Sequence, residues 1–189
     1  MNHTNSRNFS FQVPERHFQL LTSGANLTIQ DTNGSWEKDL HWIYIVTNTR
    51  FPNMVPRYQL GFLPLSEVNF GRCNLIISCD GRHSTGHIHA DLDVYFVSLN
   101  ATNRPLAEFK TCQDITNIDT CPMDRSAYYL QGARYAWLYV ITGEVQVNEL
   151  KVLTTGDSAA FFVQYTDLLL TFENLSSTKK AELLLINTA

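Results

Sequence analysis

The stretch "ITGEVQVNELKVLTTGDSAAFF", residues 141–162, shows the fold most clearly. Short runs of β-branched and aromatic residues alternate in it with turn residues: Gly143, Asn148-Glu149 and Gly156-Asp157. Glycine suits positions where the backbone takes a positive φ, and Asn or Asp side chains cap tight turns. The stretch therefore predicts consecutive antiparallel strands joined by tight turns.

The same pattern continues along the chain in both directions, while helical periodicity is nearly absent. Along the whole chain the candidate strands are 17–23, 40–47, 73–79, 87–99, 133–143, 144–148, 158–164, 167–173 and 181–187. Many short strands with close turn signals predict an all-β sandwich or barrel. Two segments interrupt the strands: 48–58, which reads as a linker, and the long polar connection 100–126.

The composition excludes several classes of protein. Hydrophobic residues make up 44% and charged residues 17%, which is typical of a globular chain. A net charge of −4 gives no reason to expect nucleic acid or an acidic membrane as a partner. No apolar run approaches the roughly 18 residues of a membrane span, and no signal peptide is visible, so we expect a cytoplasmic protein. Its thiols, including Cys112 and Cys121, which could close a loop if oxidised, are then expected to be reduced.

The segment "GRHSTGHIHADLDVY", residues 81–95, holds the clearest candidate metal ligands. His87, His89 and Asp93 would share one face of a strand with Asp91 and Tyr95. Imidazoles and a carboxylate on one face could form part of a metal shell. The other face is wholly apolar and is expected to point inward, so the histidines are expected to face solvent. A solvated polar face is therefore preferred, with a metal site at His87, His89 and Asp93 as the alternative.

Several fragments together resemble the pirin family, specifically its bacterial quercetin 2,3-dioxygenase-like members. They occur in the family's order: "FQVPERHFQLLTSG" (11–24), "LHWIYIV" (40–46), "PRYQ" (56–59), "HADLDVY" (89–95), "RYAWLYVITGEVQVN" (134–148), "GDSAAF" (156–161) and "AELLLIN" (181–187). The resemblance implies two cupin barrels in tandem. It also implies a single metal, typically iron, in the first barrel, held by a His-x-His pair and then by a His and a Glu after a "SAG"-like turn.

The resemblance also indicates that these ligands are incomplete. The fragment at residues 11–24 matches a late part of the first barrel, so the segment that would hold the His-x-His pair is not in this chain. Aligned by the "TSG" turn, the third ligand position falls on Ile29 and the Glu position on Asp31. A facial set of imidazoles and a carboxylate is needed to hold a divalent first-row metal, and Asp31 alone cannot supply it. The family's dioxygenase activity is therefore doubtful here.

These observations give a specific set of expectations. The fold is an all-β, cupin-type jelly-roll barrel over residues 58–189, preceded by a remnant of a first barrel over residues 1–57. The remnant leaves strand edges unpaired, so it is expected to pack on the second barrel or to form a homodimer. Function is expected to be that of a non-catalytic ligand-binding or protein-interaction module, without catalytic residues or cofactor. The alternative is a dioxygenase using iron or another divalent first-row metal at His87 and His89.

Overall fold

The computed structural model describes residues 1–6, 10–22, 28–51, 54–55, 57–64, 70–102 and 123–189. The chain divides into two compact units, residues 1–63 with 77–91, and residues 64–76 with 92–189. The predicted division between residues 57 and 58 falls at the beginning of strand β5, Arg57–Phe62, and stays a prediction. Cys112 and Cys121 and most of the polar connection lie outside the described residues. No helix in the described part of the chain is long and apolar enough to span a membrane.

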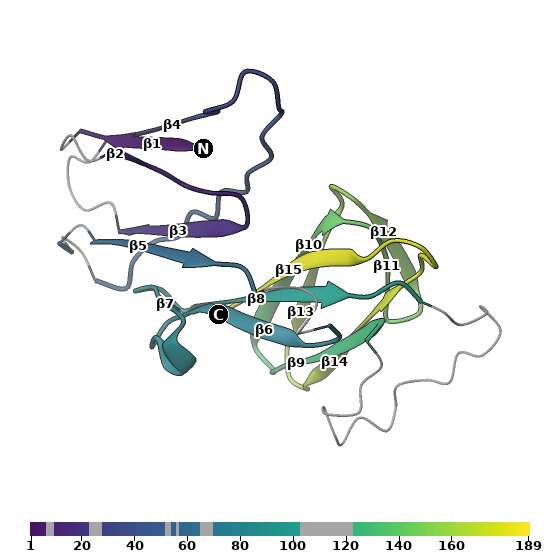
Figure 1. The fold of residues 1–189 in the computed structure, drawn as a ribbon. Helices are drawn as coiled ribbons and strands as arrows, with labels where there is room; N and C mark the ends of the chain where they lie inside the picture. The colour runs from purple at the N-terminus through teal and green to yellow at the C-terminus, as the bar shows by residue number, and fades with distance from the viewer. Residues whose placement is uncertain (7–9, 23–27, 52–53, 56, 65–69, 103–122) are drawn as a thin grey trace. The chain divides into compact units, whose positions relative to one another are not determined.

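The second unit is built from two antiparallel sheets (Figure 1). One sheet has the order β13-β10-β15-β8-β6, formed by Ser158–Val163, Arg134–Thr142, Ala181–Thr188, Leu92–Leu99 and Cys73–Ser78. The other has the order β12-β11-β14-β9, formed by Lys151–Thr154, Glu144–Val147, Leu168–Asn174 and Arg125–Leu130. The all-β prediction is confirmed, and most of the predicted strands of this unit are found within one or two residues of their expected ends.

The core of the second unit lies between its two sheets. One face of each strand supplies aliphatic and aromatic side chains to it, among them Val97, Leu138, Leu185, Leu170 and Phe172, all at most 1% exposed. Strand β15 is buried on both faces because its sequence "AELLLIN" is apolar almost throughout.

The tight turns predicted within residues 141–162 are formed. Asn148 and Glu149 both have positive φ, 49° and 58°, at the centre of a tight turn that the Leu150 amide closes by donating to the Val147 carbonyl at 3.1 Å. The Asn148 side chain also accepts a hydrogen bond from the Thr171 amide at 2.8 Å. Gly143 has φ 98°, and a Cβ atom there would lie 2.6 Å from the Cβ of Ala181, so only glycine fits.

The first unit consists of two small sheets. The first has the order β2-β1-β4, formed by Ser10–Gln12, Asn2–Asn5 and Ile29–Thr32. The second pairs β3, His17–Thr22, with β5, Arg57–Phe62. A short 3-10 turn, η2 at Arg82–Ser84, precedes β7, Gly86–His87, which pairs in parallel with the end of β6.

Two strand predictions are wrong. Residues 40–47 form no strand, and none of the described strands pairs with them. The expected strand 87–99 is broken at residues 88–91, and β8 begins only at Leu92. His89 and Asp91 consequently lie outside any strand, and the five polar side chains expected on one face are not held on one strand.

Candidate functional site

A buried histidine–aspartate pair joins strands β1 and β4 in the first unit. The ladder sets His3 directly opposite Asp31, and the Nδ1 atom of His3 lies 2.7 Å from Oδ1 of Asp31. The His3 side chain is fully buried, and that of Asp31 is 2% exposed. A buried carboxylate is stabilised when it is paired in this way, and removing either side chain would leave the other buried without its partner.

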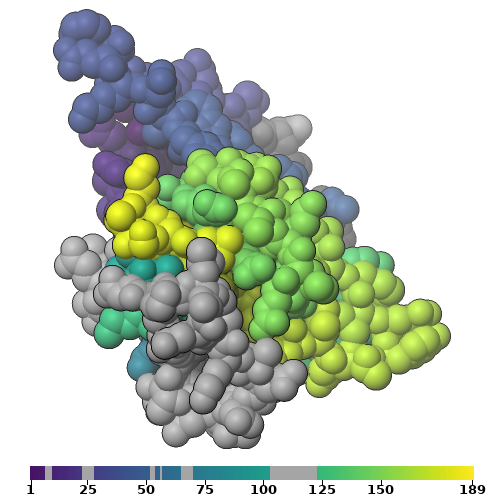
Figure 2. Space-filling view, turned by 90° about the vertical axis from the view of Figure 1, so that its right-hand side faces the viewer, coloured from purple at the N-terminus to yellow at the C-terminus, as the bar shows by residue number. Residues whose placement is uncertain are grey.

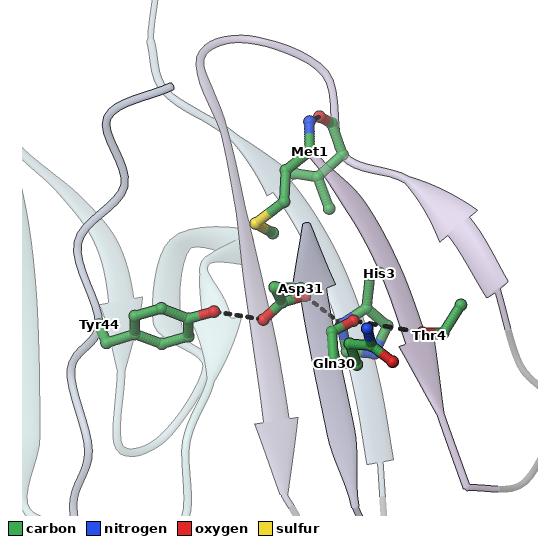
Figure 3. A network of polar contacts seen from close by, with 7 residues as sticks. Met1, His3, Thr4, Gln30, Asp31 and Tyr44 are labelled. Carbon is green, nitrogen blue, oxygen red and sulfur yellow. Dashed lines mark hydrogen bonds and ion pairs between the residues drawn. The ribbon is translucent and has the colours of Figure 1, made fainter. Parts of the chain in front are cut away.

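Tyr44 completes the set from a segment without regular secondary structure (Figure 3). Its hydroxyl donates to Oδ2 of Asp31 at 2.5 Å. Both oxygens of the carboxylate are thus engaged, one by His3 and the other by Tyr44. Burial, followed by the hydrogen bond and the negative charge of Asp31, raises the pKa of Tyr44 to about 12. We call His3, Asp31 and Tyr44 the polar triad.

Aromatic rings cover the histidine of the polar triad. The Phe11 ring lies 4.8 Å from the His3 ring between centroids, and the Tyr58 ring lies 6.1 Å away and nearly parallel to it. Burial, and then the charge of Asp31, raise the pKa of Tyr58 to about 12. The Nε2 atom of His3 is buried and has no hydrogen-bond partner among the described residues. The surroundings are those of a packed interior.

The positions expected to hold a metal do not fit one. Ile29, at the beginning of β4, offers an alkyl side chain that is 42% exposed and has no lone pair for a metal. Asp31 retains a carboxylate, but both of its oxygens already accept hydrogen bonds within the polar triad. Within the described ranges, no three His, Cys, Asp or Glu side chains gather in an arrangement that could hold a metal ion. The groups that hold the Asp31 carboxylate are the His3 ring and the Tyr44 hydroxyl.

The alternative ligands His87, His89 and Asp93 are only partly brought together. The rings of His87 and His89 touch at 4.4 Å between centroids, both half-buried in the first unit. The Gln59 side chain fixes the His87 backbone through two hydrogen bonds of 3.0 Å. Burial, and then the nearby positive charges of His87 and Arg57, lower the pKa of His89. Asp93 lies on β8 in the second unit, directly opposite Asn187 of β15.

Asp93 and Tyr95 of β8 were expected to face solvent, and this prediction is wrong. Val97 and Leu99 belong to the core, and Tyr95 packs against it from the same strand face, so this face points into the second unit. Leu92, Val94 and Phe96 on the opposite face are also buried, at 5%, 1% and 1% exposed. Both faces of the strand are therefore covered, and the polar residues of β8 do not form a solvated face.

The interior of the second unit contains a polar cluster that the sequence did not reveal. The Nε atom of Arg134 donates to the Asn187 side chain at 2.6 Å, and the Asn187 amide bonds the Tyr128 hydroxyl. The Tyr95 and Tyr128 rings lie 4.9 Å apart between centroids. Burial, and then hydrogen bonding with Tyr95, raise the pKa of Tyr128. The cluster is mutually hydrogen-bonded and joins β9, β10 and β15.

No family model matches the chain. A Pasteurella multocida (strain Pm70) protein provisionally named quercetin 2,3-dioxygenase is 24% identical over 158 residues, which is 84% of this chain and 58% of that protein. Quercetin 2,3-dioxygenase of Escherichia coli (strain K12) is 23% identical over 157 residues, 83% of this chain and 57% of that protein.

Two solved structures have the same fold as this chain. The crystal structure of YhhW from Escherichia coli superposes with a TM-score of 0.73 at 20% identity, covering 100% of this chain and 67% of that one. The structure of the bacterial pirin YhhW in complex with nickel(II) gives a TM-score of 0.70 at 19% identity, with coverages of 99% and 67%. The chain has a pirin-like cupin fold.

This pirin-like cupin spans little more than half the length of the curated relatives it matches. The likeness to YhhW shows that it has the fold of that protein, and the match extends over the whole of this chain. The predicted resemblance and the predicted jelly-roll fold are confirmed.

Proposed function

We propose that this pirin-like cupin acts by binding and does not carry out the metal-dependent dioxygenase reaction for which its relatives are named. The observation that carries the proposal is the state of the two ligand positions in β4. Ile29 cannot bind a metal, and the Asp31 carboxylate is engaged on both oxygens by His3 and Tyr44.

The second unit supports the same proposal. Its interior is filled by aliphatic side chains and by the cluster of Arg134, Asn187 and Tyr128, which are hydrogen-bonded to one another. A closed core of this kind leaves little room for a substrate between the sheets. The first unit, in contrast, exposes large apolar side chains, including Trp36 at 92% and Phe62 at 70%. Exposed apolar groups favour contact with another macromolecule.

The alternative is a dioxygenase that uses a metal at His87 and His89. The contact between their rings favours it, because two imidazoles are already adjacent. A first-row metal needs at least one further protein ligand, and the described residues bring no third His, Cys, Asp or Glu to the pair. The pair by itself therefore supports adventitious binding of a surface metal better than catalysis.

Oxygen uptake with quercetin tests the proposal. Purified protein is incubated anaerobically with iron(II) or nickel(II), freed of excess metal, and mixed with quercetin and air. We expect no uptake above that of the free metal, and the same result for the His87→Ala/His89→Ala double variant. Catalytic turnover in the unmodified chain would overturn the proposal. Turnover that disappears in the double variant would establish the alternative.

A further inference from the structure

Residues 40–47, "LHWIYIVT", have the composition of a strand but belong to none of the described sheets. β-branched and aromatic residues favour strands because they pack well against neighbours on a pleated surface. Every backbone amide and carbonyl of such a segment needs a partner or water. A β-prone segment that lies at the surface without a neighbouring strand is therefore a site for strand addition.

From Trp42 to Val46 the side chains of this segment are exposed in alternation, and His41 and Thr47 are exposed as well. Leu40, Trp42, Tyr44 and Val46 are 37%, 41%, 53% and 90% exposed, whereas Ile43 and Ile45 between them are half-buried. The Trp42 and Tyr44 rings meet edge-on at 6.1 Å between centroids. Figure 2 shows residues around this segment, in blue, at the surface of the first unit. Over residues 42–46 the more exposed face carries aromatic and aliphatic side chains with the period of a strand.

The charges that flank the segment favour a second copy in antiparallel orientation. Glu37, Lys38 and Asp39 precede the segment with a net charge of −1, and all three are exposed. Arg50 follows it; its exposed side chain also forms a surface ion pair with Asp91, at 3.3 Å. Residues 40–47 themselves contain no Asp, Glu, Lys or Arg. Antiparallel pairing of two copies sets the acidic end of each beside the Arg50 of the other, whereas parallel pairing sets like charges together.

The exposed area is adequate for a weak dimer. A fully exposed aromatic side chain offers about 200 Å², so Trp42, Tyr44 and Phe51, at 41%, 53% and 61% exposed, leave on the order of 300 Å² bare per chain. Two copies, with Leu40, Val46 and the paired backbones added, approach the lower limit of about 1,200 Å² for specific interfaces. An isologous pair of this size is expected to depend on concentration.

We propose that residues 40–47 pair in antiparallel fashion with the same segment of a second copy of this chain, forming a homodimer through the first unit. The proposal names the segment that joins the two copies. It is separate from the proposed function, because the pairing uses no residue of the polar triad except the exposed ring of Tyr44.

Sedimentation velocity of the full chain between about 1 and 100 µM tests the proposal. We expect a monomer–dimer equilibrium that Val46→Lys and Val46→Pro each weaken at least tenfold. Val46→Lys places a charge on the more exposed face, and Val46→Pro removes the amide that the ladder needs. Leu150→Lys is the matched control, because Leu150 is 89% exposed at a turn of the second unit; it is expected to leave the equilibrium unchanged.

A monomer at every concentration, or a dimer that both Val46 variants leave intact, would overturn the proposal. The orientation has its own test in the double variant Glu37→Lys/Asp39→Lys. In the antiparallel dimer it places lysines beside the Arg50 of the other copy and is expected to weaken association about tenfold, more strongly at low salt. An unchanged dissociation constant would exclude the antiparallel arrangement.

Discussion

The Nδ1 atom of His3 lies 2.7 Å from Oδ1 of Asp31, across a strand pair in which neither side chain is more than 2% exposed. In this pirin-like cupin an aspartate at a position where the family resemblance implies a metal-binding glutamate is held by a histidine and a tyrosine instead. The polar triad therefore links β1 to β4 through buried side chains. It is also the basis for the proposed absence of metal chemistry.

Asp31→Ala should destabilise the first unit by about 3 kcal/mol or more, because it leaves the buried His3 without its partner. Tyr44→Phe removes one hydrogen bond from a half-exposed ring and should cost about 1 kcal/mol. Urea denaturation followed by circular dichroism measures both. Tyr165→Phe, at an 85% exposed tyrosine, is the control and should have no effect. Equal stability of Asp31→Ala and the unmodified protein would show that the pair is not structural.

Three tyrosines should titrate late: Tyr44 and Tyr58 near Asp31, and Tyr128 in the second unit. The pKa values of Tyr44 and Tyr58 are each raised from 10 to about 12. Between these values the unfolded chain has lost protons that the folded chain retains, so stability is complete below pH 10 and falls as the pH rises towards 12. Ultraviolet absorbance of the phenolate measures the titration. Tyr44→Phe should remove one late-titrating group; if all tyrosines titrate near pH 10, the packing around Asp31 is wrong.

Gly143→Ala should be markedly more destabilising than Gly156→Ala. Both glycines have positive φ, 98° and 90°, so an alanine at either position strains the backbone at a cost of about 1–2 kcal/mol. Only at Gly143 would the new Cβ also press on Ala181, at 2.6 Å, whereas nothing lies within 4 Å at Gly156. Thermal unfolding of the two variants isolates the steric contribution. Equal losses would contradict the close approach of β15 to this turn.

Asn187→Leu should destabilise the second unit by about 2–3 kcal/mol, because it deprives Arg134 and Tyr128 of an interior hydrogen-bond partner. Gln146→Leu provides the comparison, since its amide bonds only the exposed Glu149 carbonyl, at 3.2 Å. Urea unfolding of both variants is the measurement. If the two losses are similar, the polar cluster contributes little to the stability of the barrel.

Much of the second unit was predictable from sequence because its signals are local. Turn residues such as Gly143 and Asn148 need particular φ values, and strands such as β15 need a continuous apolar run, so each reveals itself in a few residues. The prediction failed for residues 40–47, where β propensity is high but a strand also requires a neighbour that sequence alone does not supply.

The candidate site was less accessible to sequence analysis. The family resemblance singled out Ile29 and Asp31, but nothing marked His3 as the partner of Asp31, because the two are 28 residues apart and meet only through the β1–β4 register. Their short strands, of four residues each, carry mostly polar residues and give little periodic signal. Asp93 was misplaced because β8 is buried on both faces, which its alternation did not reveal.

Metal content tests the central claim most directly. The purified chain is dialysed anaerobically against iron(II), and separately against nickel(II), and its metal is measured by mass spectrometry after passage over a desalting column. The account predicts well under one metal ion per chain, with Asp31→Ala no lower than the unmodified protein. One tightly held ion per chain that Asp31→Ala abolishes would contradict it.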